Sequence, residues 1–170
     1  TFATQSSNAQ TPSKYGATPE DSVNCLNKLS EYNEFFKQKD YQAAIPGWRW
    51  VFINCPKSSK KMFSNGEKMY KSFIRKQKDT EKKAKLIDTL LSIYDKRIEN
   101  FGQEGFVLGK KGVDMMQYRS NSYEEAYTIL TTSVDKQGKK SKGSALTAYF
   151  QSAVLMLENE KIEKTKLIEI

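Results

Sequence analysis

The tetrapeptide Gly-Lys-Lys-Gly at residues 109–112 has a composition suited to holding phosphate groups. A loop of this type clamps a nucleic-acid backbone when strands flank it. No strand pattern flanks it here. Glu104 and Lys111 also stand where a nucleotide-binding phosphate loop needs glycine and serine or threonine. We therefore expect the tetrapeptide to lie in a helix, with two small residues that permit close packing.

Histidine is absent from the chain, which removes much of the chemistry that an enzyme would use. It is the usual general base near neutral pH and the commonest metal ligand, and both Ser–His and Cys–His nucleophiles need it. The two cysteines alone cannot complete a four-ligand zinc site. The carboxylate pairs Glu20–Asp21 and Glu124–Glu125 stand at predicted helix starts, where they oppose the helix dipole. The sequence predicts no enzyme, no metal and no cofactor.

The chain carries a net charge of +8, and many of its basic residues fall into two groups. Such groups can neutralise the phosphates of a nucleic acid or another polyanion. The neighbouring aromatic residues lie on a predicted apolar stripe, so a solvated helix face is the favoured interpretation. A helical repeat protein that binds nucleic acid or polyanion stays as the alternative function. The first group is Lys57, Lys60, Lys61, Lys68, Lys71, Arg75, Lys76, Lys78, Lys82, Lys83 and Lys85; the second is Lys136, Lys139, Lys140 and Lys142.

Apolar residues spaced three and four apart recur along the chain and predict helices with short connections. Because no stretch keeps a strand-like alternation, we expect an all-α protein with about seven to eight helices. The predicted ranges are 18–36, 41–55, 62–74, 79–102, 104–118, 122–138 and 146–157, with a last helix from about residue 161.

Caps and apolar faces make these predictions specific. The segment from Ser122 to Glu125 predicts a capping box for the sixth helix. The faces expected to be buried include Leu146 and Phe150 in the seventh helix and, in the first, Val23, Leu26, Leu29, Tyr32 and Phe36.

The two ends of the chain differ in composition from its centre. Residues 1–17 are polar and predict a disordered tail, and residues 18–170 predict one helical domain. Ser7 and Ala9 fit the small positions of a signal-peptide cleavage before Gln10, so the tail is either a signal-peptide remnant or a floppy tail. An apolar end without a cap at Ile170 predicts a domain truncated inside a helix. No run of 18 apolar residues predicts a membrane span.

Internal similarity indicates repeats. The motif KAKLID at residues 83–88 recurs as KTKLIE at residues 164–169, and recurring helix pairs are typical of stacked arrays. Residues 25–58 form a helix–turn–helix block that resembles a tetratricopeptide repeat, and SYEEAYTIL at residues 122–130 is similar to the second helix of that repeat. The first block carries Phe35, Ala44, Trp48, Val51 and Pro56 at the spacings of the repeat.

The resemblance has departures. Tyr32 stands where the first unit should have a small residue, whereas Gly66 and Gly112 fit that position in later units. Pro46 falls inside the second helix, removes one backbone donor and should kink it.

The segment WRWVFINCP at residues 48–56 looks like envelope-associated repeat proteins of Gram-negative bacteria. That likeness implies an exported protein in the periplasm or cell envelope. Trp48 is expected to pack between paired helices, and Trp50 should point elsewhere.

The family resemblance implies a right-handed α-solenoid of antiparallel helix hairpins that acts as a non-catalytic scaffold for a protein or peptide. In this family, ligands lie in a concave groove lined by the first helix of each repeat. The clamp that holds a peptide's terminal carboxylate does not carry over, because Leu29 and Phe106 stand where that clamp uses lysine. Leu29 and Phe36 are equally suited to the core. The carried-over positions are Leu29, Asn33, Phe36 and Lys37, then Lys60, Phe63, Glu67, Tyr70 and Lys71, and finally Met116 and Gln117.

The repeat geometry also brings the two cysteines together. Cys25 opens the first helix of the first unit and Cys55 closes the antiparallel second helix. In an oxidising compartment this implies a disulfide that stabilises the hairpin by about 2–4 kcal/mol. Two buried thiols are the other interpretation.

Overall fold

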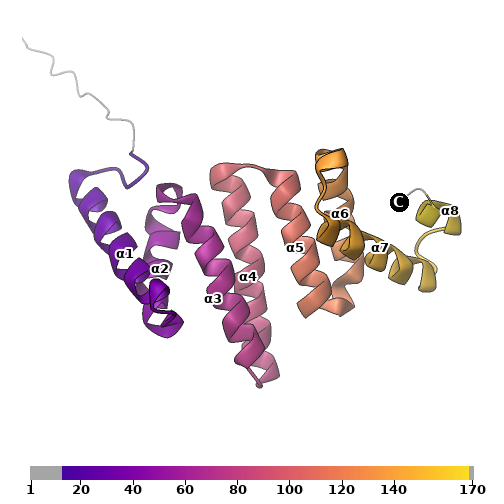
Figure 1. Ribbon diagram of the computed structural model, residues 1–170, viewed down its shortest axis with the longest axis horizontal. Helices are drawn as coiled ribbons and strands as arrows, with labels where there is room; N and C mark the ends of the chain where they lie inside the picture. Colours follow the sequence, from indigo (N-terminus) through magenta and orange to yellow (C-terminus); the bar gives the residue numbers. More distant parts are fainter. Residues whose placement is uncertain (1–12, 169–170) are drawn as a thin grey trace, which may run out of the picture. The chain divides into compact units, whose positions relative to one another are not determined.

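The chain is helical in the computed structural model, which describes residues 13–168 (Figure 1). Within these residues there is no β-strand, so the all-α prediction is confirmed. The α-helices of the described residues are α1 (Pro19–Lys37), α2 (Tyr41–Asn54), α3 (Lys60–Lys76), α4 (Thr80–Phe101), α5 (Glu104–Tyr118), α6 (Tyr123–Gln137), α7 (Gly143–Glu158) and α8 (Lys164–Ile168). Short 3₁₀ turns precede α3, α6 and α7 at Pro56–Ser58, Ser120–Ser122 and Gly138–Lys140.

The helices belong to two compact units, divided within α3 between Asn65 and Gly66. The first unit holds the hairpin of α1 and α2. Thr18 caps α1 in a complete capping box with Asp21, and Pro19 follows at the first helical position. Asp40 caps α2, which continues through Pro46 to Asn54. These local signals explain why both helices begin where the sequence predicts.

The core of the first unit surrounds Trp48. This side chain is 1% exposed, and its indole nitrogen donates a hydrogen bond of 2.9 Å to the backbone oxygen of Met62. Trp50 is half-buried. Cys25 and Cys55 are buried and joined by a disulfide, which ties the start of α1 to the end of α2. The disulfide therefore links the two helices of the first hairpin, and Trp48 links α2 to the start of α3.

The apolar face predicted for α1 is partly wrong. Val23 and Leu26 are 57% and 48% exposed, whereas Cys25 and Tyr32 are buried. The reason is that α1 meets α2 closely at Gly47, where an added Cβ atom would lie 3.2 Å from the Cβ atom of Tyr32. Helix α2 covers only a narrow stripe of α1, so Val23 and Leu26 beside that stripe stay exposed to water.

Close helix packing also shapes the second unit. A Cβ atom at Gly112 would lie 2.4 Å from Cγ of Leu130, and one at Gly109 would lie 2.8 Å from Oγ of Ser133. Both partners belong to α6, which packs on α5. The Gly-Lys-Lys-Gly segment is thus helical, and its glycines serve close packing as expected.

Three further predictions for the second unit need correction. Ser122 makes no capping hydrogen bond, because a 3₁₀ turn replaces the extended backbone that a capping box requires. The last helix begins at Lys164, three residues after the expected start. Leu146 and Phe150 are 41% and 48% exposed, since α7 buries its small residues instead; these are Ala145, Ala148, Ser152 and Ala153.

The predictions for the ends fall largely outside the described residues. The proposed cleavage before Gln10 and the chain end at Ile170 both lie there. Of the predicted tail, residues 13–17 are described, and the backbone nitrogen of Gly16 donates to the oxygen of Ser13 at 3.1 Å. Among residues 13–168, no helix combines the length and apolar character needed to cross a membrane.

Candidate functional site

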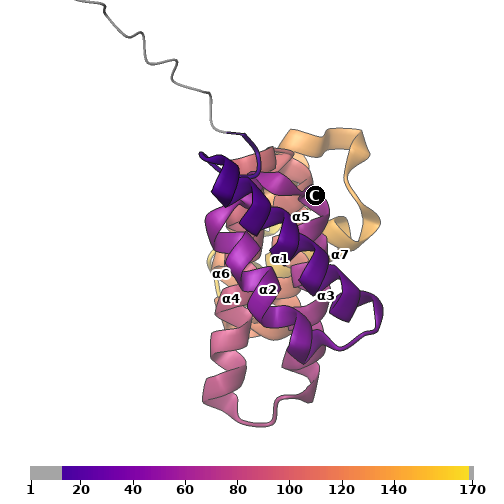
Figure 2. The ribbon, with the colours of Figure 1, turned by 90° about the vertical axis from the view of Figure 1, so that its left-hand side faces the viewer.

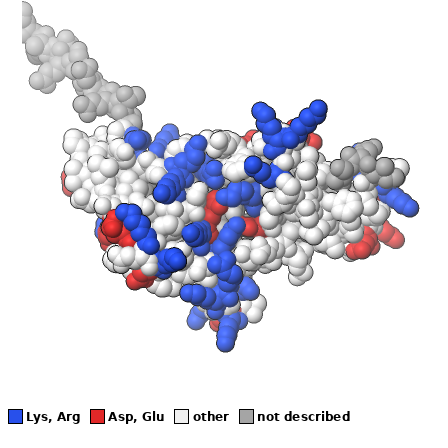
Figure 3. Space-filling view, viewed as in Figure 1, with Lys and Arg blue, Asp and Glu red and all other residues white. Residues whose placement is uncertain are grey.

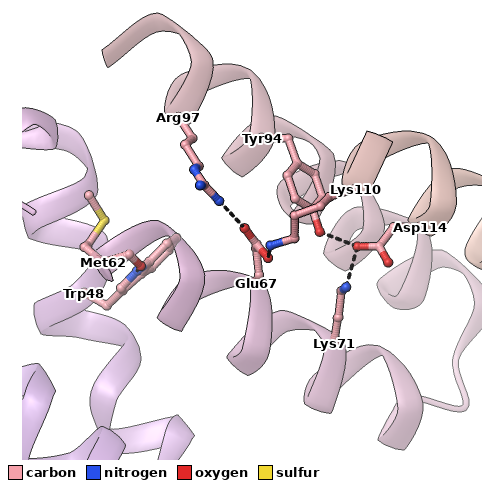
Figure 4. A network of polar contacts seen from close by, with 8 residues as sticks. All are labelled: Trp48, Met62, Glu67, Lys71, Tyr94, Arg97, Lys110 and Asp114. Carbon is pink, nitrogen blue, oxygen red and sulfur yellow. Dashed lines mark hydrogen bonds and ion pairs between the residues drawn. The ribbon is translucent and has the colours of Figure 1, made fainter. Parts of the chain in front are cut away.

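The second unit contains a cluster of charged and polar side chains between three helices (Figure 4). Each helix contributes two residues, spaced three or four positions apart, so that both lie on one face. We call this group the charge cluster; it consists of Glu67 and Lys71 from α3, Tyr94 and Arg97 from α4, and Lys110 and Asp114 from α5.

Glu67 is the centre of the first half of the cluster. It is only 5% exposed, and one carboxylate oxygen lies 3.4 Å from Nη1 of Arg97, which is equally buried. Its other oxygen accepts a bond from Nζ of Lys110. The Arg97 guanidinium also lies 5.6 Å from the centroid of the Phe106 ring. Glu67 therefore neutralises a cation that has almost no access to water.

Asp114 is the centre of the second half. It is 2% exposed, accepts a hydrogen bond of 2.5 Å from the Tyr94 hydroxyl, and lies 2.8 Å from Nζ of Lys71. The Lys71 side chain is 28% exposed, so this pair reaches toward solvent. A buried carboxylate with two such partners is satisfied rather than left uncompensated.

The two ion pairs between α3 and α5 share one register. Glu67 pairs with Lys110 and Lys71 with Asp114, so both pairs join residues 43 positions apart. The difference in residue number between contacting residues stays constant along two helices only when the helices run in the same direction. Helices α3 and α5 therefore lie parallel, with α4 supplying Tyr94 and Arg97 to the same cluster.

The charged groups of the cluster are paired with one another. Both carboxylates are engaged by cations, and the Tyr94 hydroxyl donates a hydrogen bond to Asp114. Within residues 13–168, no group of three or more acidic, cysteine or histidine residues could hold a metal ion. The geometry supports a role in fixing the three helices relative to one another.

Tyr94 has a pKa far above its ordinary value of 10, because burial disfavours the phenolate and the charges of Asp114 and Glu67 oppose it further. Folding thus keeps Tyr94 neutral under conditions in which the unfolded chain would ionise it. Its contribution to stability is complete below pH 10 and is lost as the pH rises above that value.

This predicts a difference between the native chain and a Tyr94→Phe variant. Above pH 10, the free energy of unfolding of the native chain should fall more steeply than that of the variant, by up to about 1.4 kcal/mol per pH unit. Urea denaturation at several alkaline pH values, followed by far-UV circular dichroism, measures both slopes. Parallel pH profiles for the two proteins would contradict the buried, neutral state of Tyr94.

A second feature of this unit is an open groove of about 330 Å³ between α5 and α7. Its lining combines apolar side chains, such as those of Met116 and Ala148, with amide and hydroxyl side chains that supply hydrogen-bonding groups. None of its lining residues is charged. We call this the α5–α7 groove; its lining residues are Val113, Met116, Gln117, Ser144, Thr147, Ala148 and Gln151.

Four of the residues predicted for a ligand groove occur in these two features. Glu67 and Lys71 belong to the charge cluster, and Met116 and Gln117 line the α5–α7 groove. Phe63 and Tyr70 are 0% and 2% exposed. The sequence-predicted positions of α3 are therefore divided between buried aromatic residues and a polar cluster, with Lys60 exposed at the start of the helix.

The candidates of the first unit have local partners. Asn33 donates to the backbone oxygen of Leu29 at 2.8 Å, and its own oxygen accepts from Asn65 at 3.4 Å. Phe36 stacks on Tyr41 with a centroid distance of 5.4 Å. Lys37 forms an exposed ion pair with Glu34. Leu29 and Phe36 are half-buried, so both keep a surface that a ligand can reach.

Sequence reasoning missed Tyr94, Arg97, Lys110 and Asp114. A signal was present, because Lys110 and Asp114 are oppositely charged and four positions apart, as are Glu67 and Lys71. Matching these two pairs would have identified the parallel contact between α3 and α5.

Comparison of the chain with protein-family models, with curated proteins and with solved structures finds no match. The function is therefore inferred from the residues of this chain and their geometry.

Proposed function

We propose that this chain is a tetratricopeptide-like α-solenoid that acts as a non-catalytic scaffold and binds an extended segment of a protein or peptide in the α5–α7 groove. The partner's backbone would pair with the amide groups of Gln117 and Gln151, while small apolar side chains contact Met116 and Ala148. The neutral lining favours a ligand recognised by its backbone and apolar side chains rather than by its charge.

The observation that carries this proposal is that α5 and α7, which are separated in the sequence by α6, line one groove. In a stacked array of hairpins, the first helices of successive hairpins lie side by side in this way. The parallel register of α3 and α5 supports the same side-by-side arrangement for the preceding pair of first helices, α3 and α5, in the second unit.

The disulfide supports the second part of the proposal, which is an exported protein of the cell envelope. Disulfides persist in oxidising compartments such as the periplasm and are rare in the cytosol of mesophiles. The bond between Cys25 and Cys55 is buried in the first hairpin. A buried structural disulfide fits an exported chain better than a cytosolic one.

A random peptide library displayed on phage and selected on the full chain tests the scaffold function. The recovered peptide is then titrated against native protein and against a Gln117→Lys variant, with fluorescence anisotropy as the readout. A long cationic side chain in the groove should weaken binding about tenfold or more. Gln42→Lys is the matched control, because Gln42 is equally exposed on a helix of the first unit and does not line the groove.

Salt dependence separates this proposal from polyanion binding. Since the groove lining is uncharged, peptide affinity should change little with salt, whereas polyanion binding falls steeply as salt rises. Equal loss of peptide affinity in Gln117→Lys and Gln42→Lys, or a steep salt dependence, would overturn the groove as the binding site.

A further inference from the structure

The turn between α3 and α4 is an exposed part of the second unit that is rich in cations. Residues 75–85 contain six cations and two carboxylates, and no residue from 75 to 86 is buried. Figure 3 shows blue side chains gathered where the α3–α4 turn lies in Figure 1. We call residues 75–85 the basic tip. Its cations are Arg75, Lys76, Lys78, Lys82, Lys83 and Lys85, and its carboxylates are Asp79 and Glu81.

The basic tip extends past the helices beside it. Arg119, just after the end of α5, pairs with Asp88 of α4, so this pair marks how far along α4 the neighbouring helix reaches. The residues of α4 before Asp88 continue for about two further turns, or about 12 Å. Figures 1 and 2 show the α3–α4 turn extending beyond the ends of α5 and α6 in both views. This extension contributes little to the core.

The carboxylates of the basic tip are already engaged. Asp79 accepts a hydrogen bond of 2.9 Å from the backbone nitrogen of Lys82 and so caps α4. Glu81 pairs with Lys85 at 2.7 Å. The other five cations have no acidic partner among the residues that the structure describes. They are Arg75, Lys76, Lys78, Lys82 and Lys83.

We propose that the basic tip docks the chain onto the surface of an anionic lipid bilayer. A projecting turn can place several of its cations against a flat surface at the same time. Clusters of four to eight basic residues suffice for such electrostatic attachment, with a contribution that grows with each lysine. This contact is independent of the α5–α7 groove and would position a groove-bound partner at the membrane surface.

Two features favour lipid headgroups over nucleic acid. Proteins that hold single strands stack bases on aromatic side chains, and specific duplex readers rely on arginine for paired hydrogen bonds to guanine. The uncharged residues of the basic tip are Gln77, Thr80 and Ala84, and five of its six cations are lysines. The basic tip therefore has no aromatic ring on which a base could stack and only one arginine, whereas its lysines suit contact with charged headgroups.

Co-sedimentation of the full chain with lipid vesicles tests the proposal. Native protein should bind phosphatidylcholine vesicles that contain about 30% phosphatidylglycerol, and binding to pure phosphatidylcholine vesicles should be weaker by more than tenfold. A Lys76→Gln/Lys78→Gln/Lys82→Gln variant should lose about a hundredfold in partition coefficient on the anionic vesicles. Because these side chains are exposed and unpaired, the variant is expected to fold; circular dichroism verifies this.

The matched control removes the same number of charges elsewhere. Lys139→Gln/Lys140→Gln/Lys142→Gln changes three exposed lysines near the turn between α6 and α7 and leaves the basic tip intact. This control should keep most of the binding. An equal loss in both variants would show that net charge alone is sensed and would overturn the proposal. Failure of the native protein to bind anionic vesicles, or tip-dependent binding of duplex DNA in the absence of vesicle binding, would overturn it as well.

Discussion

The free energy of unfolding of a Glu67→Ala variant is expected to be about 3–5 kcal/mol below that of the native chain, because the substitution leaves the buried Arg97 guanidinium without its carboxylate partner. Arg97 has a side chain that is 6% exposed, and arginine cannot shed its charge by deprotonation. Lys110 would also lose its partner, although its 31% exposure lets water replace part of the interaction. Urea denaturation followed by far-UV circular dichroism measures this loss.

Two further variants show whether burial is the cause. Glu81→Ala removes a carboxylate from the Glu81–Lys85 pair, whose side chains are 80% and 73% exposed, so its effect should stay within about 0.5 kcal/mol. A Glu67→Ala/Arg97→Met double variant should be more stable than Glu67→Ala alone, because no buried charge remains unpaired. Equal losses for Glu67→Ala and Glu81→Ala would contradict the buried charge cluster.

Replacing both Cys25 and Cys55 with alanine is expected to lower the stability of the first unit by about 3–4 kcal/mol. The bond closes a loop whose ends are 30 positions apart, so its removal restores considerable freedom to the unfolded chain. The two tryptophans of the chain, Trp48 and Trp50, both lie in this unit. Tryptophan fluorescence during urea denaturation therefore follows the first unit alone.

The second unit provides the internal control for this experiment. Far-UV circular dichroism reports on the helices of both units. The part of the circular dichroism transition that belongs to the second unit should therefore keep its urea midpoint in the Cys25→Ala/Cys55→Ala variant. Reduced native protein should match the double variant in the fluorescence transition. A fluorescence midpoint unchanged by either treatment would show that the disulfide adds nothing to stability.

Helix boundaries could be predicted where local signals were complete. The prediction for α5 matched the observed bounds because Gly102 ends α4 and leaves a two-residue connection. The capping box at Ser122 was wrong, since the 3₁₀ turn at Ser120–Ser122 sets the backbone of Ser122, and the residues from Ser122 to Glu125 do not determine it. Local sequence therefore predicted the elements better than the form of their ends.

Burial and pairing across helices were harder to predict, because they depend on which helices meet. Val23 and Leu26 lie on the apolar side of α1, yet α2 covers a narrower stripe and leaves both exposed. The partners of Glu67 lie 30 and 43 positions away, beyond the reach of a periodicity argument. The α5–α7 groove likewise depends on two helices that the sequence separates, although Met116 and Gln117 were predicted from the first of them.

The shared register of α3 and α5 has a mechanical consequence. If α5 slid along α3 by four residues, about 6 Å, in one direction, Lys110 would come opposite Lys71. In the other direction, Asp114 would come opposite Glu67. Either shift breaks both native ion pairs and brings two like charges together. The alternation of positive and negative side chains along the two helices therefore opposes sliding of α5 along α3. A force applied parallel to these helices would be resisted in both directions.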